Sequence, residues 1–116
     1  MGKYQDNAEY NKLVRDNIPN IITADGLRVE TRQLSNEEVI SELLKKAIEE
    51  AQELSEAKGV EEISTEMSDV LEILHSLADR LNMSMDEIEN LRQIRANKRG
   101  RFENGIYLVR TYREEK

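Results

Sequence analysis

Two pairs of carboxylates stand at helical spacing near the middle of the chain. Glu50 and Glu53 form one pair, and Glu66 and Asp69 form the other, each with its members three residues apart. Residues three apart lie on one face of an α-helix, so each pair can present both carboxylates together. Carboxylate oxygens suit Mg²⁺ and Mn²⁺, and Mg²⁺ usually completes its shell with water and substrate phosphates. One such pair would indicate only a solvated helix face, whereas two pairs predict a divalent-metal site.

The apolar residues around each pair predict where the carboxylates point. At about 100° per residue, Glu50 and Glu53 lie roughly 70° and 130° from the centre of the apolar stripe on residues 39–54. The second pair has similar offsets, in the same rotational sense, from the stripe on residues 63–81. A short connection through Gly59 favours antiparallel packing of the two helices. Equal offsets then bring all four carboxylates to one side of the hairpin, where their repulsion favours a bound cation.

Two neighbouring features are weaker candidates for chemistry. Glu49 falls nearly opposite the apolar stripe of its helix, so it faces solvent or a neighbouring subunit, and its candidate catalytic role is to orient water. Glu72 and His75 have the Glu-x-x-His spacing of di-iron bundles. Because His75 is the only histidine and the motif has no second copy, a di-iron centre is disfavoured.

Capping signals and apolar periodicity predict the elements that carry these residues. Ser35 and Ser84 each precede a glutamate three residues further on, which is the capping-box pattern, and Gly59 and Gly100 are natural C-terminal stops. We expect a mostly α-helical protein, an antiparallel helical bundle with a small peripheral β-sheet of short strands. The expected helices cover residues 19–25, 35–58, 61–81 and 84–99, and the expected strands cover 10–15, 27–34 and 105–112.

The chain's length and composition indicate one small domain. Its 116 residues predict a flexible tail over 1–9 and a single helical domain over 10–116. There is no cysteine and therefore no disulfide or thiolate metal site. No apolar run approaches the ~20 residues of a membrane span, and the polar start lacks the apolar core of a secretory signal, so we expect a cytoplasmic protein. Apolar stripes on three helices favour a homodimer or higher homo-oligomer, with a compact monomer as the alternative.

Charge is segregated along the chain. Residues 35–91 hold sixteen acids and four bases, whereas residues 92–116 hold eight bases and three acids. This division fits a cation and an anion bound side by side, and it also fits solvated helix faces. A nucleic-acid partner is disfavoured by the net charge of −7 and by the shortage of aromatic residues to stack on bases.

The acidic residues, taken in order, resemble the motif of a known enzyme family. The pattern Glu49-Glu50-x-x-Glu53, a twelve-residue gap and Glu66-x-x-Asp69 is similar to that of the MazG-like all-α nucleoside triphosphate pyrophosphohydrolases. This superfamily includes phosphoribosyl-ATP pyrophosphohydrolase and the dimeric all-α dUTPases. Residues 10–19 and 98–108 look like segments of one small branch of it, so the resemblance covers about residues 10–110.

The resemblance implies Mg²⁺-dependent hydrolysis between the α- and β-phosphates of a nucleotide, which gives a monophosphate and pyrophosphate. Clearance of non-standard nucleotides is one expected role, and Mn²⁺ is the alternative metal. Arg101 stands where the family usually has a glycine, which alters the backbone's approach to a phosphate. Carried over by position, the metal ligands are Glu50, Glu53, Glu66 and Asp69, the catalytic candidates are Glu49 and Glu53, and the phosphate-binding candidates are Lys12, Arg15, Lys98 and Arg101.

Two alternatives remain open from the sequence. The same chemistry could act on phosphoribosyl-ATP, or the chain could be a non-catalytic helical interaction module on the same scaffold. The four intact acids speak against the module, because an inactive relative would be free to lose them. The preferred base, the choice between one and two metal ions, and the identity of the general base are not determined by the sequence.

Overall fold

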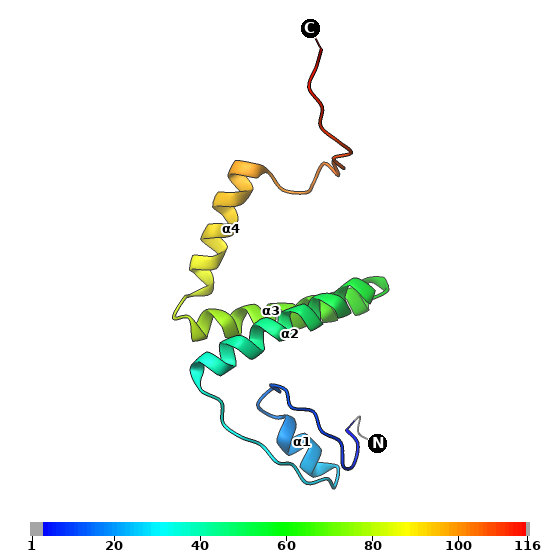
Figure 1. The fold of residues 1–116 in the computed structure, drawn as a ribbon, viewed down its shortest axis with the longest axis vertical. Coiled ribbons are helices and arrows are strands. Elements are labelled where there is room, and N and C mark those ends of the chain that lie inside the picture. Colours follow the sequence, from blue (N-terminus) through cyan, green and yellow to red (C-terminus); the bar gives the residue numbers. More distant parts are fainter. Residues whose placement is uncertain (1–3, 116) are drawn as a thin grey trace. The chain divides into compact units, whose positions relative to one another are not determined.

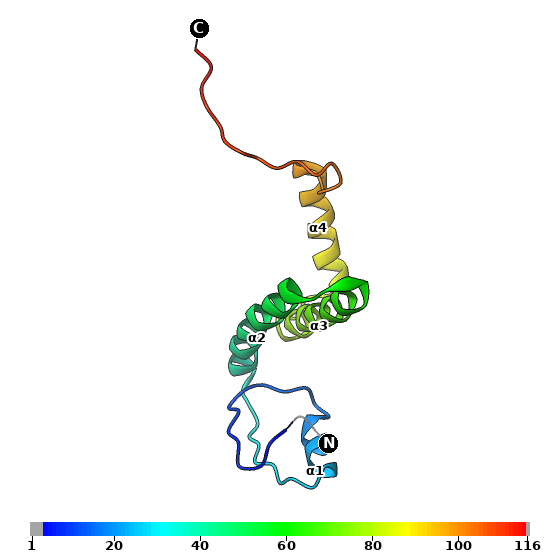
Figure 2. The ribbon, with the colours of Figure 1, turned by 90° about the vertical axis from the view of Figure 1, so that its right-hand side faces the viewer.

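The computed structural model describes residues 4–115 and is mostly helical, as the sequence predicts. Within that range it contains α-helices and no β-strand (Figures 1 and 2). The chain divides into two compact units at the boundary between Asn82 and Met83. The helices are α1 (Ile18–Ala24), α2 (Asn36–Glu56) and α3 (Gly59–Arg80) in the first unit, and α4 (Met85–Arg99) in the second.

Helices α2 and α3 form an antiparallel hairpin in the first unit (Figure 1). The predicted capping box starts α2: the Glu38 amide donates to Ser35 Oγ at 3.2 Å, and the Ser35 amide donates to Glu38 Oε1 at 3.0 Å. Helix α2 ends at Glu56, and Gly59 is the first residue of α3, with a φ of +79°. The prediction that Gly59 stops the first helix of the hairpin was therefore wrong, because its positive φ turns the chain into the second helix instead.

A small apolar core holds the hairpin and the N-terminal segment together. Val39, Leu43 and Ile73 are buried where α2 meets α3. Leu13 and Leu34, which lie outside the helices, pack against this cluster, as do Ala47 and Leu77. The chain before α2 is thus fixed to the hairpin by burial of apolar side chains.

The predicted peripheral β-sheet is not present in the part of the chain that the structure describes. Residues 10–15, 27–34 and 105–112 contain no strand. In the last of these segments the side chains are largely exposed, with Ile106 85% and Leu108 74% accessible. Alternation of apolar and polar residues shows that a segment can form a strand, but a strand also needs a backbone partner. Among the described residues, none of these segments pairs with another as strands do.

The remaining elements follow local signals. In the second unit Ser84 caps α4 through a second capping box, and the helix ends at Arg99, followed by Gly100 with a φ of +85°. In the expected N-terminal tail, residues 1–3 lie outside the described residues, and residues 4–9 are irregular with the Tyr4 ring 5.7 Å from that of Tyr10. No helix within residues 4–115 has both the length and the apolar character needed to cross a bilayer.

Candidate metal centre

Three carboxylates from two helices converge on one side of the hairpin. Glu50 and Glu53 come from α2 and Glu66 from α3, and each offers an oxygen within 4.8 Å of those of the other two. Spacing of three residues sets Glu50 and Glu53 on one face of α2. The packing of α2 on α3 then brings the third carboxylate to them. The structure therefore brings together three of the four metal ligands that the sequence proposes.

Two of these carboxylates have an oxygen in need of a partner. Glu50 Oε2 and Glu66 Oε2 are shielded from solvent and accept no hydrogen bond from the described residues. Burial raises the pKa of Glu50, and the negative charge of Glu53 raises it further. The pKa of Glu66 is raised by burial and then by the charges of Glu53 and Asp69. Buried acceptors are rarely left unpaired in folded proteins, so a cation at this place would satisfy both oxygens.

Asp69, the fourth proposed ligand, is engaged by an arginine from the N-terminal segment. Arg15 Nη2 donates to Asp69 Oδ1 at 2.9 Å. Asp69 lies outside the group of three carboxylates, yet its charge contributes to the raised pKa values of Glu50 and Glu66. Arg15 is also a predicted phosphate ligand, and the structure places it beside the acidic cluster.

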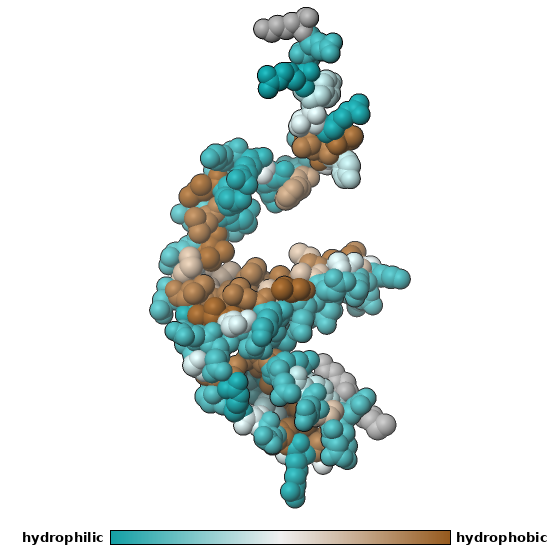
Figure 3. Space-filling model, in the orientation of Figure 1, coloured by the Kyte–Doolittle hydropathy of each residue, from teal (hydrophilic) through white to brown (hydrophobic). Residues whose placement is uncertain are grey.

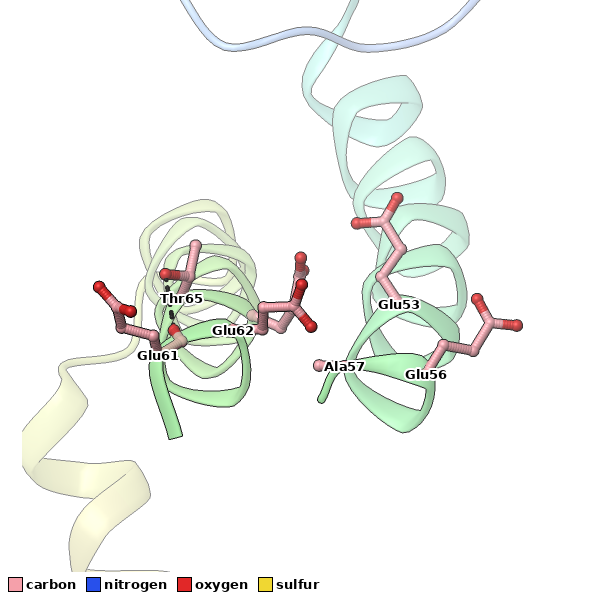
Figure 4. A pocket seen from close by; sticks show the side chains of 7 residues that line it. Glu53, Glu56, Ala57, Glu61, Glu62 and Thr65 are labelled. Carbon is pink, nitrogen blue, oxygen red and sulfur yellow. Dashed lines mark hydrogen bonds between the residues drawn. The ribbon is translucent and has the colours of Figure 1, made fainter. Parts of the chain in front are cut away.

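An open cleft of about 520 Å³ lies beside the cluster, at the end of the hairpin where α2 turns into α3. Figure 4 shows Glu62 reaching from α3 toward α2, whereas Glu56 and Glu61 turn away from the gap. Glu62 Oε2 accepts a hydrogen bond from the Lys58 amide at 2.7 Å, and its charge also raises the pKa of Glu66. The sequence interpretation missed Glu62, although its spacing of four from Glu66 places both on one helix face.

The other proposed site residues lie outside the three-carboxylate group. Glu49 is exposed, with its Oε2 4.0 Å from Lys46 Nζ. The Lys12 ammonium lies 5.9 Å from the centre of the Tyr10 ring, a cation–π contact. In the second unit, Lys98 is in the last turn of α4, and Arg101 Nη1 lies 3.2 Å from Glu103 Oε1.

The donor set fits a hard divalent cation. All the converging atoms are carboxylate oxygens, the ligands that Mg²⁺ and Mn²⁺ prefer. The unpartnered Oε2 atoms of Glu50 and Glu66 supply the structural reason for a cation, and the exposure of Glu53 leaves room for water or substrate on the same ion. No protein-family model, curated protein or solved structure matches the chain.

Proposed function

We propose that the protein is a Mg²⁺-dependent nucleotide pyrophosphohydrolase of the MazG-like all-α type. It hydrolyses a nucleoside triphosphate or related nucleotide between the α- and β-phosphates, and Mn²⁺ can replace Mg²⁺. The observation that carries the proposal is the convergence of carboxylate oxygens of Glu50, Glu53 and Glu66 within 4.8 Å, with two buried oxygens that lack hydrogen-bond partners in the part of the chain that the structure describes. The resemblance of the acidic motif to that family supports the reaction class.

In this proposal the carboxylates bind the metal, and one of them accepts a proton from water. Glu50, Glu53, Glu66 and Asp69 would hold Mg²⁺, which when bound would neutralise phosphate oxygens and favour deprotonation of water. The water oxygen bonds to the attacked phosphorus, the bond from that phosphorus to its bridging oxygen breaks, and pyrophosphate leaves. A cluster carboxylate accepts the water's proton, and Glu53 is suited to this because it is exposed to solvent. Glu49 is the further candidate for orienting the water.

The cationic side chains supply the complementary charge for the phosphates. A nucleotide carries several negative charges, and the cleft beside the cluster is lined largely by glutamates. The phosphates of the nucleotide therefore need positive charge from the metal ion and from basic side chains. Guanidinium and ammonium groups suit phosphate oxygens. The proposed phosphate ligands are Lys12, Arg15, Lys98 and Arg101.

We also propose that a second copy of the chain covers the apolar side of the hairpin. Ile48 is 73% exposed and Leu71 49%, and Figure 3 shows apolar residues along α2 and α3. At about 100° per residue, Ile48 lies roughly 160° from Glu50, and Leu71 roughly 160° from Asp69. A homodimer through this side would bury the apolar stripe and leave the carboxylates free. A nucleotide substrate suits a cytoplasmic enzyme.

Pyrophosphate release is the test. Wild-type protein is incubated with Mg²⁺ and a panel of nucleoside triphosphates that also includes phosphoribosyl-ATP, and the Glu53→Gln and Asp69→Asn variants are compared. We expect Mg²⁺-dependent release that falls by more than about 100-fold in both variants, because each removes a proposed metal ligand. Glu72→Gln is the matched control, since it alters a carboxylate of α3 outside the cluster and should retain activity.

The panel also separates the alternatives. Preferential release from phosphoribosyl-ATP would identify that compound as the substrate. The exposed apolar side of the hairpin favours, as the second candidate function, a non-catalytic interaction module. No release from any nucleotide, together with no binding of Mg²⁺ or Mn²⁺ by calorimetry, would reject the enzyme and leave the module.

A further inference from the structure

We infer that Arg15 is a built-in counter-ion of the carboxylate cluster and that its guanidinium competes with a divalent cation for Asp69. The contact that carries this is the 2.9 Å ion pair between Arg15 Nη2 and Asp69 Oδ1. The inference rests on the metal centre of the proposed function. It adds an order of binding to that function: the cation binds first and releases Arg15 from Asp69, and Arg15 then binds a phosphate.

The fold delivers Arg15 to the hairpin from a distant part of the sequence. Leu13, two residues earlier, packs against the buried core of α2 and α3. Arg15 and Asp69 are 54 positions apart in the chain, so their pairing is a tertiary contact. The chain after Arg15 leads into α1, and the Arg15 carbonyl oxygen accepts a hydrogen bond from the Ile18 amide at 3.0 Å. The backbone is therefore held in place both before and after Arg15.

The charges around the cluster explain why the pair forms. Glu50, Glu53 and Glu66 crowd together, and Asp69 adds a fourth negative charge that is felt by Glu50 and Glu66. Without a metal, the Arg15 guanidinium offsets the charge of Asp69. The Lys46 ammonium partly opposes the rise that burial causes in the pKa of Glu50. Among these four acids Asp69 is the one in a salt bridge, so Arg15 acts on the cluster through Asp69.

The pair is exposed enough to exchange. The Arg15 side chain is 59% accessible and that of Asp69 32%. Ion pairs with this much solvent contact are weak and open readily. When Asp69 binds a divalent cation in place of Arg15, the guanidinium loses its partner but remains beside the cluster. Its free N–H donors can then bind a phosphate of a nucleotide held at the same centre.

Such competition couples the two ligands. A cation that releases Arg15 strengthens phosphate binding, and by reciprocity a phosphate that engages Arg15 strengthens cation binding. Without a cation, Asp69 keeps Arg15 engaged and the cluster repels anions. The arrangement thus disfavours binding of a nucleotide before the metal.

The test is Mn²⁺ binding by titration calorimetry, without nucleotide, for the full chain and four variants. Arg15→Gln should tighten Mn²⁺ binding by about two- to fivefold, the factor set by loss of an exposed ion pair. In an Asp69→Asn background the same substitution should have no effect, because its target has gone. Arg28→Gln, at an exposed arginine of the same unit, is the charge-matched control and should leave the affinity unchanged.

A second readout covers the case in which Asp69→Asn abolishes binding. The Arg15 Nε–H resonance of the wild type is followed during Mg²⁺ titration, and we expect it to shift as the ion pair opens. A resonance that stays unchanged at Mg²⁺ saturation would overturn the inference.

The remaining outcomes are distinct. Unchanged or weaker Mn²⁺ binding in Arg15→Gln, with normal binding in the wild type, would overturn competition and leave the metal centre standing. Equal tightening in Arg28→Gln would assign the effect to net charge and also overturn it. Absence of Mn²⁺ binding in the wild type would overturn the metal centre itself, and this inference with it.

Discussion

Glu50 on α2 and Glu66 on α3 each keep one carboxylate oxygen, Oε2, shielded from water and without a hydrogen-bond partner among the described residues. The two side chains also approach the same third carboxylate, Glu53. Desolvation and like charge both disfavour this arrangement in the metal-free protein. A protein that retains it gives up stability at this place, as is common at functional sites.

The first prediction concerns pH. Glu50 and Glu66 have folded-state pKa values above the ordinary glutamate value of 4.5, so above pH 4.5 the folded state binds more protons than the unfolded state. Their contribution to the free energy of unfolding of the metal-free protein therefore falls as pH rises through the raised pKa values. Denaturant unfolding in EDTA between pH 4.5 and 8 measures this slope.

A matched variant isolates the cluster from other carboxylates. In Glu50→Gln the downward slope should be shallower than in the wild type. Glu89 does not interfere, because Arg92 and Gln93 lower its pKa to about 2 and its stabilising effect is lost only at lower pH. Identical slopes in the two proteins would contradict strain at the cluster.

The second prediction separates stability from metal binding. Glu66→Gln should raise the melting temperature of the metal-free protein, because it removes one negative charge from the crowded group. The same change should weaken Mn²⁺ binding by at least about tenfold, since a proposed ligand is lost. Thermal melts with EDTA and with Mn²⁺ measure both effects. Glu72→Gln, on α3 outside the cluster, should change neither, and a fall in the metal-free melting temperature of Glu66→Gln would count against the prediction.

The convergence of Glu50, Glu53 and Glu66, three of the four predicted carboxylates, could be read from the sequence because much of its geometry is local. The spacing of three between Glu50 and Glu53 fixes their shared face, and the apolar stripes fix how α2 meets α3. The contact between Arg15 and Asp69 could not be predicted in this way. It joins residues 54 apart and depends on where the irregular N-terminal segment packs.

The strand predictions failed for a related reason. Residues 105–112 contain the continuous apolar run Ile106–Val109, which can form a strand, yet such a run carries no information about a pairing partner. Gly59 shows the same limit at shorter range. A glycine after a helical pattern indicates a positive φ, and the structure has that φ, but at the start of α3 rather than at the end of α2.

The third prediction concerns the cap that starts α2, the helix that carries Glu50. Ser35→Ala should lower the free energy of unfolding by about 1 kcal/mol, because the Glu38 amide loses its acceptor. Ser41→Ala, at an exposed position within α2, is the control and should be within about 0.5 kcal/mol of wild type. Denaturant unfolding at pH 7 measures both. An equal loss in the two variants would show that the cap has no special role.

The fourth prediction tests whether a second copy covers the apolar side of the hairpin. Leu44 and Ile48 on α2 and Leu71 on α3 are 54%, 73% and 49% exposed in the single chain. Burying a side chain such as isoleucine stabilises an assembly by about 1.5–3 kcal/mol, and in a two-fold dimer each substitution occurs twice. Ile48→Glu should therefore weaken dimerisation by at least about 100-fold in sedimentation experiments. Gln33→Glu adds the same charge at an exposed site outside the helices and should leave the dimer intact. A monomeric wild type, or an Ile48→Glu protein that dimerises as tightly as the wild type, would show that this side of the hairpin is not the dimer interface.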